Sequence, residues 1–491
     1  ALRKDKMNTE ILKLKPAIVW HYFKEILEIP RPSKKEDKIL AHLLEFAKKF
    51  NLEILQDEIG NVLIRKEATK GMEGKKWVVL QSHVDMVCEK NSNKDFDFEN
   101  DPIESLIEGE WVTANDTTLG ADDGIGVAAQ MAILASNDIQ HGPIECLFTV
   151  DEETGLTGAF GLMEGFLKSK ILLNLDSEDE GELFIGCAGG QDTQAWLPFD
   201  RESAPEGYKA YKIMVSGLKG GHSGDEIEKG HANANKILNR FLWTNKGEFN
   251  MKLNYFDGGN LRNAIAREAY AICLIPELME SKLISAVRKF KKMSRSEFSI
   301  TEPYMEITIN PIEIPDNVID DESFTELVNA IYACPHGVIA MSQSIENFVE
   351  TSTNLASVKF LDDEILITTS QRSSVESGKQ DITNMVKSVF NLAGGRTKTS
   401  DGYPGWTPNP DSEIMNITVD SYKKLFKMEP EVLAIHAGLE CGLIGDKYPE
   451  MDMISFGPTI KRAHSPEEKI EIDSVSKFWD LTLDVLKNIP N

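Results

Sequence analysis

The feature that most constrains this fold is a set of short apolar segments, each followed at once by acidic or imidazole side chains. The segments and the residues that follow them are Val78–Leu80 with His83, Ile144–Val150 with Asp151-Glu152-Glu153, and Leu172–Leu175 with Asp176. An apolar run without polar alternation is typical of a strand buried on both faces, as in a parallel sheet. Because α/β sheets bind ligands at the carboxyl ends of their strands, we expect these side chains at one edge of one sheet.

His83 and Asp85 are two residues apart in the stretch VVLQSHVDMV. If the chain stays extended there, both side chains leave it on the same face. An aspartate beside a histidine fixes the tautomer of the ring or orients it as a metal ligand. The structural alternative is a histidine at a strand end whose hydrogen bonds are simply satisfied.

Acidic side chains accumulate in these motifs without nearby Lys or Arg. At about 4 Å and an effective dielectric near 20, each close pair of carboxylates costs about 4 kcal/mol. Asp122 and Asp123, in LGADDGIG, precede a helix of small residues expected at 127–135, and the positive end of that helix is an alternative explanation for them. His464 follows another strand near the end of the chain, as His83 does.

Divalent cations are the simplest compensation for such a cluster. Mixed imidazole and carboxylate ligands favour Zn²⁺, with Mn²⁺ or Co²⁺ as substitutes. Three carboxylates, Asp122, Glu153 and Asp176, with a bridging hydroxide would carry four negative charges, which two divalent ions cancel. The pattern therefore predicts two metal ions per chain.

The first part of the chain is predicted to be α/β. Helices are expected at 17–30 and 35–51, followed by two strands around a glycine turn within 52–68. After Asp401 strands return, and a closing helix is expected from Asp473 to Lys487, with Asp473 as its N-cap.

The middle of the chain has a different pattern of predicted helices and strands. Helices are expected at 231–245, 276–294, 322–333 and 377–392, with long alternating strands such as Asn263–Leu274 and Glu364–Gln371. We interpret the order as a β-α-β-β-α-β unit that occurs twice, first from YKAYKIMVSG to EITIN and then in a run ending near Arg396. Residues 1–188 and 402–491 are therefore predicted to form one discontinuous domain, and residues 189–401 an inserted α+β domain.

Charge and composition exclude several classes of partner. The formal net charge of −26, from 79 acidic and 53 basic residues, argues against nucleic acid. No apolar run approaches the roughly 20 residues of a membrane span, and the beginning of the chain does not read as an export signal. The six cysteines contain no C-x-x-C pair, so reduced thiols and a cytoplasmic location are expected. Met7 is interpreted as the natural start.

Several motifs together resemble the co-catalytic di-zinc exopeptidases, and among these most closely the Xaa-His (aminoacyl-histidine) dipeptidases. The motifs are SHVDMV, LGADDGIG, DEETG, LNLDSED, GGHSG, RNAI, HAGLECG and AHSPEE, in this order over nearly the whole chain. The resemblance implies a mixed-sheet catalytic domain with an inserted lid domain made of two ferredoxin-like halves. It also implies that small peptides are the substrates.

The resemblance assigns a role to each residue of the cluster. Asp122 would bridge two zinc ions, with His83 and Asp176 completing one site and Glu153 and His464 the other. Asp85 would orient His83, and the peptide bond between Asp122 and Asp123 would be cis. Glu152 would be the general base on a metal-bridging water and then the proton donor to the leaving amine. Because adjacent residues of an extended chain point oppositely, Glu153 could hold metal while Glu152 faces the substrate.

In the inserted domain the resemblance makes His222 a donor to the oxyanion, and Asn263, Arg372 and the Gly438 backbone ligands of the substrate's polar groups and carboxylate. The structural alternatives are a surface turn for His222, a strand-end cap for Asn263 and a surface ion pair for Arg372. The remaining histidines, including His436, are interpreted as structural.

The predicted function is hydrolysis of short peptides, chiefly dipeptides with a free amino terminus such as Xaa-His. The enzymatic alternatives are an N-acyl-amino-acid deacylase and a tripeptide aminopeptidase of the same family. The non-enzymatic alternative is a silent relative that binds metal or peptide. Either a monomer or a homodimer is compatible with the sequence.

Overall fold

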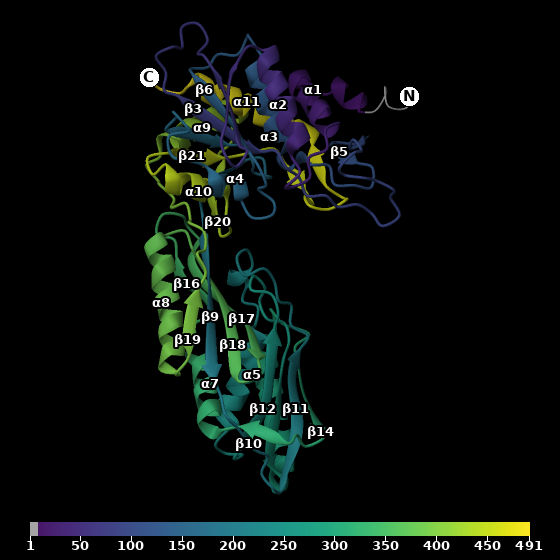
Figure 1. Ribbon diagram of the computed structural model, residues 1–491, viewed down its shortest axis with the longest axis vertical. Coiled ribbons are helices and arrows are strands. Elements are labelled where there is room, and N and C mark those ends of the chain that lie inside the picture. The colour runs from purple at the N-terminus through teal and green to yellow at the C-terminus, as the bar shows by residue number, and fades with distance from the viewer. Residues whose placement is uncertain (1–7) are drawn as a thin grey trace. The chain divides into compact units, whose positions relative to one another are not determined.

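The computed structural model describes residues 8–491, and Met7 and the residues before it lie outside this range. The described chain divides into two compact units. Unit 1 comprises the chain up to Gly186 together with Pro408–Ala434 and Leu439–Asn491, and unit 2 comprises Cys187–Thr407 and Ile435–Gly438. In Figure 1, purple N-terminal and yellow C-terminal elements occur together in unit 1.

Unit 1 is built around a mixed sheet whose described strands have the order β1-β2-β6-β3-β7-β21-β8-β20. The strands are β1 (Glu53–Gln56), β2 (Val62–Lys66), β3 (Val78–His83), β6 (Ile144–Thr149), β7 (Ile171–Asn174), β8 (Glu182–Cys187), β20 (Glu431–Ile435) and β21 (Asp452–Ser455). β3 runs parallel to both β6 and β7, and all three strands are fully buried. Their carboxyl ends therefore lie at one edge, as the apolar segments predict.

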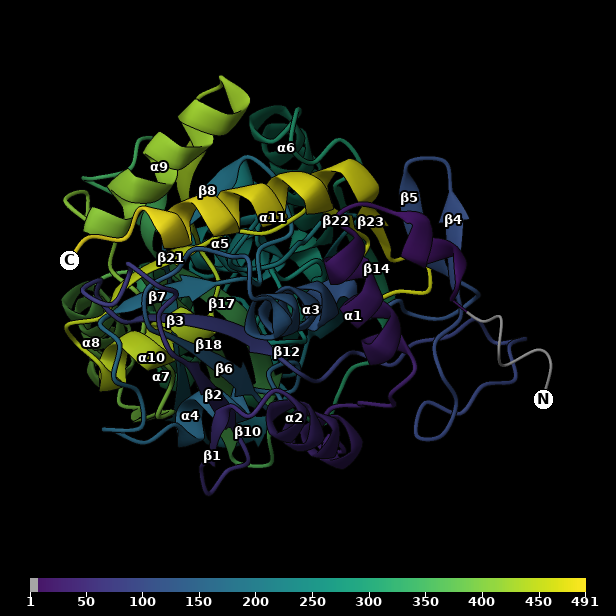
Figure 2. The same cartoon turned by 90° about the horizontal axis from the view of Figure 1, so that it is seen from above.

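Helices pack on this sheet, and a small second sheet has the order β22-β23-β5-β4. The helices are α1 (Ala17–Leu27), α2 (Asp37–Lys49), α3 (Ala121–Ala135), α4 (Thr157–Gly161), α9 (Glu413–Phe426), α10 (Glu440–Lys447) and α11 (Ile472–Lys487), and the small strands are β4 (Ser105–Glu108), β5 (Trp111–Ala114), β22 (Ile460–Lys461) and β23 (Lys469–Glu471). α3 is buried along its length and packs between β3 and α1. Figure 2 shows α11 with α9 beside it.

Unit 2 contains the predicted duplicated β-α-β-β-α-β pattern. Its strands are β9 (Gly189–Pro198), β10 (Arg201–Ser203), β11 (Tyr208–Ser216), β12 (Lys252–Gly259), β13 (Ala269–Pro276), β14 (Glu306–Ile312), β15 (Asn317–Ile319), β16 (Gly337–Met341), β17 (Val349–Phe360), β18 (Glu364–Ser373) and β19 (Arg396–Thr399). Its helices are α5 (Ala234–Asn245), α6 (Glu280–Glu297), α7 (Asp321–Ala333) and α8 (Glu376–Leu392). One antiparallel sheet has the order β14-β11-β13-β12-β17-β18-β9-β19, with β16 beside β17.

The two halves of this sheet are nested rather than consecutive. The first half is β11-α5-β12-β13-α6-β14, whereas the second is β9-α7-β17-β18-α8-β19 and so begins before the first. In each half the fourth, first, third and second strands lie side by side in that order. The prediction of two consecutive runs was therefore wrong in sequence order. The reason is that β9 ends at Pro198 whereas the rest of its half begins with α7 at Asp321, about 120 residues later, and a local sequence pattern cannot link them.

Two predicted boundaries were also wrong. The strand expected from Asn263 begins at Ala269, because residues 261–268 form a turn and a loop. The closing helix begins at Ile472, and its N-cap residue is Glu471, which makes no side-chain capping bond. Asp473 is an acid in the first turn of that helix, where it still suits the positive end.

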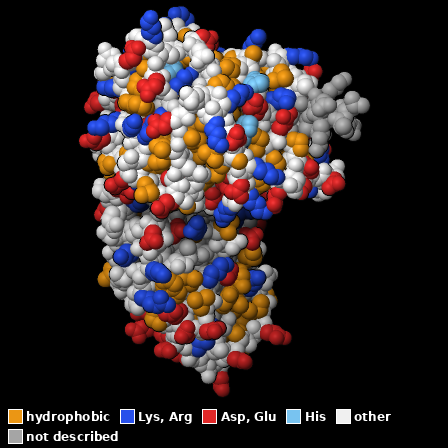
Figure 3. Space-filling view, turned by 45° about the horizontal axis from the view of Figure 1, so that its top comes forward, with side chains coloured by type: hydrophobic (Ala, Val, Ile, Leu, Met, Phe, Trp, Pro, Cys, Tyr) orange, Lys and Arg blue, Asp and Glu red, His pale blue; other side chains and the backbone are white. Residues whose placement is uncertain are grey.

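Acidic and basic side chains are interspersed over the face seen in Figure 3. None of the helices from residue 8 onward combines the length and the apolar character that crossing a bilayer requires.

Candidate metal centre and active site

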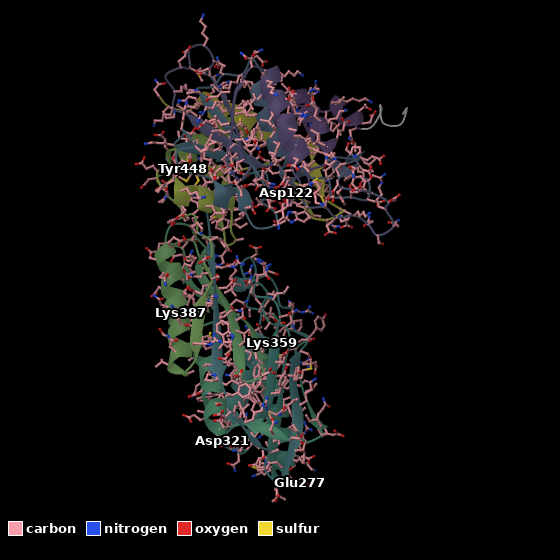
Figure 4. The ribbon with its side chains drawn as sticks, viewed as in Figure 1. Asp122, Glu277, Asp321, Lys359, Lys387 and Tyr448 are labelled. Atoms are coloured by element: carbon pink, nitrogen blue, oxygen red, sulfur yellow. The ribbon has the colours of Figure 1, made fainter. Side chains whose placement is uncertain are left out.

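The predicted cluster of side chains assembles in unit 1 at the carboxyl edge of β3, β6 and β7. His83 ends β3, Glu152 and Glu153 follow β6, and Asp176 follows β7. Asp122 lies in the first turn of α3, where Asp122 and Asp123 have non-helical backbone angles and a cis peptide bond joins them, as predicted. Asp122 is labelled in Figure 4.

Asp122 lies between the two histidines. Its Oδ1 is 2.9 Å from His83 Nε2, and its Oδ2 is 3.0 Å from His464 Nε2. The same nitrogen of His83 is 3.4 Å from Asp176 Oδ1, and that of His464 is 3.1 Å from Glu153 Oε1. One carboxylate therefore faces two groups of donors, each with one imidazole and one further acid.

Asp85 holds the other side of the His83 ring. His83 Nδ1 lies 3.2 Å from Asp85 Oδ1, and the Asp85 carboxylate also accepts from the backbone N–H groups of Glu152 and Glu153 and from the Ser33 hydroxyl. Burial raises the pKa of Asp85, but these hydrogen bonds and the charge of His83 outweigh it and hold the pKa at about 2. Asp85 thus couples the His83 ring to the loop that carries both glutamates.

Glu152 and Glu153 lie in the loop after β6, which ends at Thr149, so the alternation of an extended strand does not apply to them. The expectation from strand alternation was therefore wrong. Glu152 Oε2 is 3.9 Å and Glu153 Oε1 is 4.0 Å from His83 Nε2. The two side chains differ in a second contact, because Glu153 also meets His464.

The carboxylates of the cluster carry more negative charge than the neighbouring histidines can compensate. Burial and the charge of neighbouring acids raise the pKa values of Asp176, Asp123 and Glu152 well above their ordinary range, although His83 opposes this. Hydrogen bonds to Asp122 and Glu153 raise the pKa of His464 to about 11. Such shifts arise when carboxylates crowd together without enough cations.

The donor set fits divalent cations. Two overlapping groups can each bring one ligand atom per residue within 4.8 Å of the others, namely His83, Asp122 and Glu153, and His83, Asp123 and Asp176. Asp123 is buried, and its Oδ2 has no hydrogen-bond partner within residues 8–491. A carboxylate oxygen in that position is costly unless a cation compensates it.

Three residues that the sequence reading left unassigned support this centre. The buried guanidinium of Arg31 donates to the carbonyl oxygens of Val84, Asp85 and Gly120, which flank the metal-site motifs. Glu468 accepts from the backbone N–H groups of Leu119, Gly120 and Asp122. Glu440 accepts from Gln81 and Thr149 beneath the cluster. Glu468 belongs to the AHSPEE motif, whereas nothing in the sequence near Arg31 signals its role.

The predicted substrate-binding residues all lie in unit 2. His222 forms an isolated β-bridge with Ala264 just before a turn, and its Nδ1 accepts from the backbone N–H groups of Gly224 and Asp225. Asn263 is also in a turn and lines a cavity together with Arg372. Arg372 is buried rather than a surface ion pair, and Gly438 packs against the ring of Tyr403.

A family model agrees with this geometry. Residues 79–488 match the model described as peptidase family M20/M25/M40. The chain belongs to this family. Members of it are metal-dependent hydrolases of peptide bonds, so the predicted family and enzyme class are confirmed.

Individual relatives of this M20 peptidase cover nearly its whole length. It is 42% identical to the cytosol non-specific dipeptidase of Escherichia coli over 98% of this chain and 99% of the relative. The crystal structure of aminoacylhistidine dipeptidase from Vibrio alginolyticus matches it with a TM-score of 0.95 at 44% identity, over 98% of this chain and 99% of that one. The aminopeptidase PepT structure from Bacillus cereus, at 15% identity over 97% of this chain and all of that one, has a TM-score of 0.57 and shares the fold.

Proposed function

We propose that this M20 peptidase is a cytoplasmic, two-metal dipeptidase that cleaves dipeptides with a free amino terminus, including Xaa-His. The observation that carries the proposal is the Asp122 carboxylate, whose two oxygens face His83 and His464 at 2.9 and 3.0 Å. The similarity to the cytosol non-specific dipeptidase of E. coli and to the aminoacylhistidine dipeptidase of V. alginolyticus supports the dipeptidase activity, and the first relative also supports the location.

We assign Asp122 as the bridging ligand, His83 and Asp176 to one metal ion, and Glu153 and His464 to the other. When bound, divalent ions at these donors would polarise the scissile carbonyl and acidify water. The mixture of imidazoles and carboxylates favours Zn²⁺, with Mn²⁺ and Co²⁺ as substitutes.

Glu152 is the proposed proton carrier. Its Oε2 lies 3.9 Å from His83 Nε2, whereas the acids that pair with His464 among the described residues are Asp122 and Glu153. Its carboxylate would take a proton from the attacking water and give it to the nitrogen of the leaving amine. Asp85 would keep the His83 ring oriented through Nδ1.

Residues of unit 2 are proposed to bind the substrate. Because His222 Nδ1 accepts two backbone hydrogen bonds, a neutral ring carries its proton on Nε2 and can donate it to an oxyanion. Burial and the nearby charge of Arg372 lower the pKa of His222, which favours this neutral form. Asn263, Arg372 and the Gly438 backbone are assigned to the substrate's polar groups and terminal carboxylate.

The test is the release of histidine from Ala-His and β-Ala-His by the purified chain, with and without a chelator. We expect release that the chelator abolishes and that added Zn²⁺, Mn²⁺ or Co²⁺ restores. Cleavage of N-acetylated amino acids or of tripeptides in preference to dipeptides would instead favour a deacylase or a tripeptide aminopeptidase. Absence of chelator-sensitive cleavage from every peptide would favour a silent binding protein.

A further inference from the structure

Unit 2 contains a cavity of about 380 Å³ that is lined by polar residues and glycines. Its lining residues include Gly190, Asp192, Arg262, Asn263, Arg372 and Tyr403. This volume is within the range of small-molecule sites, which are usually much more apolar. Its polar lining suits a ligand with several polar groups.

The strand register fixes the spacing of Arg372 and Asp192, two of the three charged residues that line this cavity. In the antiparallel pair β18 and β9, Arg372 lies opposite Gly190 and Ser370 lies opposite Asp192. Residues two apart on a strand share a face, and each residue advances about 3.3–3.4 Å. Arg372 and Asp192 therefore lie on the same face of the sheet, one two-residue step apart on neighbouring strands.

The Arg372 end of the cavity is built for an anion. Arg372 is 7% exposed, and its Nε has no hydrogen-bond partner in the described part of the chain. Its Nη1 donates to the Tyr403 hydroxyl at 3.3 Å, and no carboxylate within residues 8–491 forms an ion pair with it. A buried guanidinium without an anionic partner is costly, whereas a bidentate carboxylate would neutralise its charge and accept its free N–H groups.

Gly190 lacks a side chain, and this leaves space for the ring of Tyr403 beside Arg372. A Cβ atom at Gly190 would lie 2.6 Å from Cζ of the Tyr403 ring, so a larger residue would displace the ring. The ring in turn holds its hydroxyl beside Arg372.

The Asp192 end presents a carboxylate. Asp192 Oδ2 accepts from Arg262 Nη1 at 2.8 Å, and the Arg262 side chain is 70% exposed. Asp192 Oδ1 has no hydrogen-bond partner among the described residues, so it can accept from a ligand. Asn354 donates to the carbonyl oxygens of Arg262 and Ala264 and so holds this loop over the sheet.

We propose that this cavity binds the C-terminal residue of the substrate and that Asp192 selects an imidazole or cationic side chain there. The inference rests on the proposed dipeptidase function and extends it to specificity. The residue's carboxylate would bind Arg372, and its side chain would then extend toward Asp192, which lies on the same face of the sheet two residues further along the neighbouring strand. An acidic side chain would be repelled by Asp192, and an aliphatic one would leave Asp192 Oδ1 without a donor, since Arg262 occupies only Oδ2.

The experiment compares Asp192→Asn with Asp257→Asn. Asp257 also pairs with a cation on this sheet, Lys359 at 2.9 Å, which is labelled in Figure 4, but it does not line the cavity. For each protein, kcat/KM is measured for Ala-His and Ala-Ala. We expect the Ala-His to Ala-Ala ratio to fall about ten-fold in Asp192→Asn, from loss of a charge-assisted hydrogen bond, and to stay at the wild-type value in Asp257→Asn.

Binding of free L-histidine and L-alanine, measured by calorimetry on the same proteins, gives a readout that does not depend on hydrolysis. We expect wild type to prefer L-histidine and Asp192→Asn to lose that preference, with melting temperatures showing that both variants are folded. An unchanged ratio and an unchanged preference in Asp192→Asn would overturn the inference while leaving the dipeptidase function intact. A retained histidine preference in a protein that cleaves no peptide would overturn the function instead.

Discussion

Glu152 and Glu153 are adjacent in the sequence, but we expect their replacement to affect different properties: activity alone for Glu152, and metal content as well for Glu153. Replacing Glu152 by Gln removes the proposed proton carrier but leaves every proposed ligand, so kcat for Ala-His should fall by about 10²–10⁴-fold. Replacing Glu153 by Gln removes an acid that contacts His464, so metal content should fall as well. Steady-state kinetics and elemental analysis of both variants measure kcat and metal content. A loss of metal in Glu152→Gln would contradict the assignment of Glu152 as proton carrier and Glu153 as metal ligand.

At the level of single residues, the sequence motifs predicted the side chains that gather at the sheet edge but not those that hold them. His83, Asp122, Glu153 and Asp176 follow apolar strands or open a helix, and that pattern is visible in the chain. Arg31 acts through backbone carbonyl oxygens more than 50 residues away, and such contacts leave no local signature. The role of Arg31 becomes visible only when the positions of β3 and α3 in the fold are known.

At the level of elements, the loop that carries His464 is tied to the start of α3. Glu468 accepts three backbone N–H groups there, including that of Asp122, and burial raises its pKa to about 7 although those hydrogen bonds oppose the rise. Glu468→Gln keeps the shape but weakens these acceptors, so we expect weaker metal binding, by about ten-fold, with a smaller change in kcat at saturating metal. Competition with a metal-binding indicator dye measures the metal affinity of each variant. A neighbouring control is Glu467→Gln, which alters an exposed acid, and equal effects in both variants would contradict the role of Glu468.

The seam between the two halves of the unit 2 sheet is short and sterically tight. It consists of Gly258 and Gly259 of β12 paired with Val358 and Ser357 of β17. Gly259 has φ +70°, and a Cβ there would lie 1.8 Å from the carbonyl oxygen of Ala356. Gly259→Ala should therefore destabilise the protein by about 3 kcal/mol, measured by urea unfolding.

Gly247 provides the control for this seam, because nothing lies within 4 Å of a Cβ placed there. Gly247→Ala is expected to change the free energy of unfolding by less than about 0.5 kcal/mol. Similar losses in the two variants would mean that the seam is not a point of strain. The sequence pattern showed that unit 2 is duplicated, but the pairing of β12 with β17 depends on contacts about 100 residues apart and could not be read from it.

At the scale of the whole molecule, the proposed metal donors lie in unit 1 and the proposed substrate-binding groups in unit 2. Removing the cations should therefore weaken one unit more than the other. Crowded carboxylates then repel one another without compensation, and the stabilisation that binding gives to the folded state is lost, about 2.7 kcal/mol at a metal concentration 100 times Kd. We expect a chelator to lower the melting temperature by about 5 °C or more.

After chelation, the rate of backbone hydrogen exchange should rise in β3, β6 and β7 and stay unchanged in β11 and β13. Asp122→Asn, which lacks the carboxylate facing both histidines, should show little further response to the chelator. Equal increases in exchange across both sheets would mean that the cations stabilise the molecule in some way other than through this cluster.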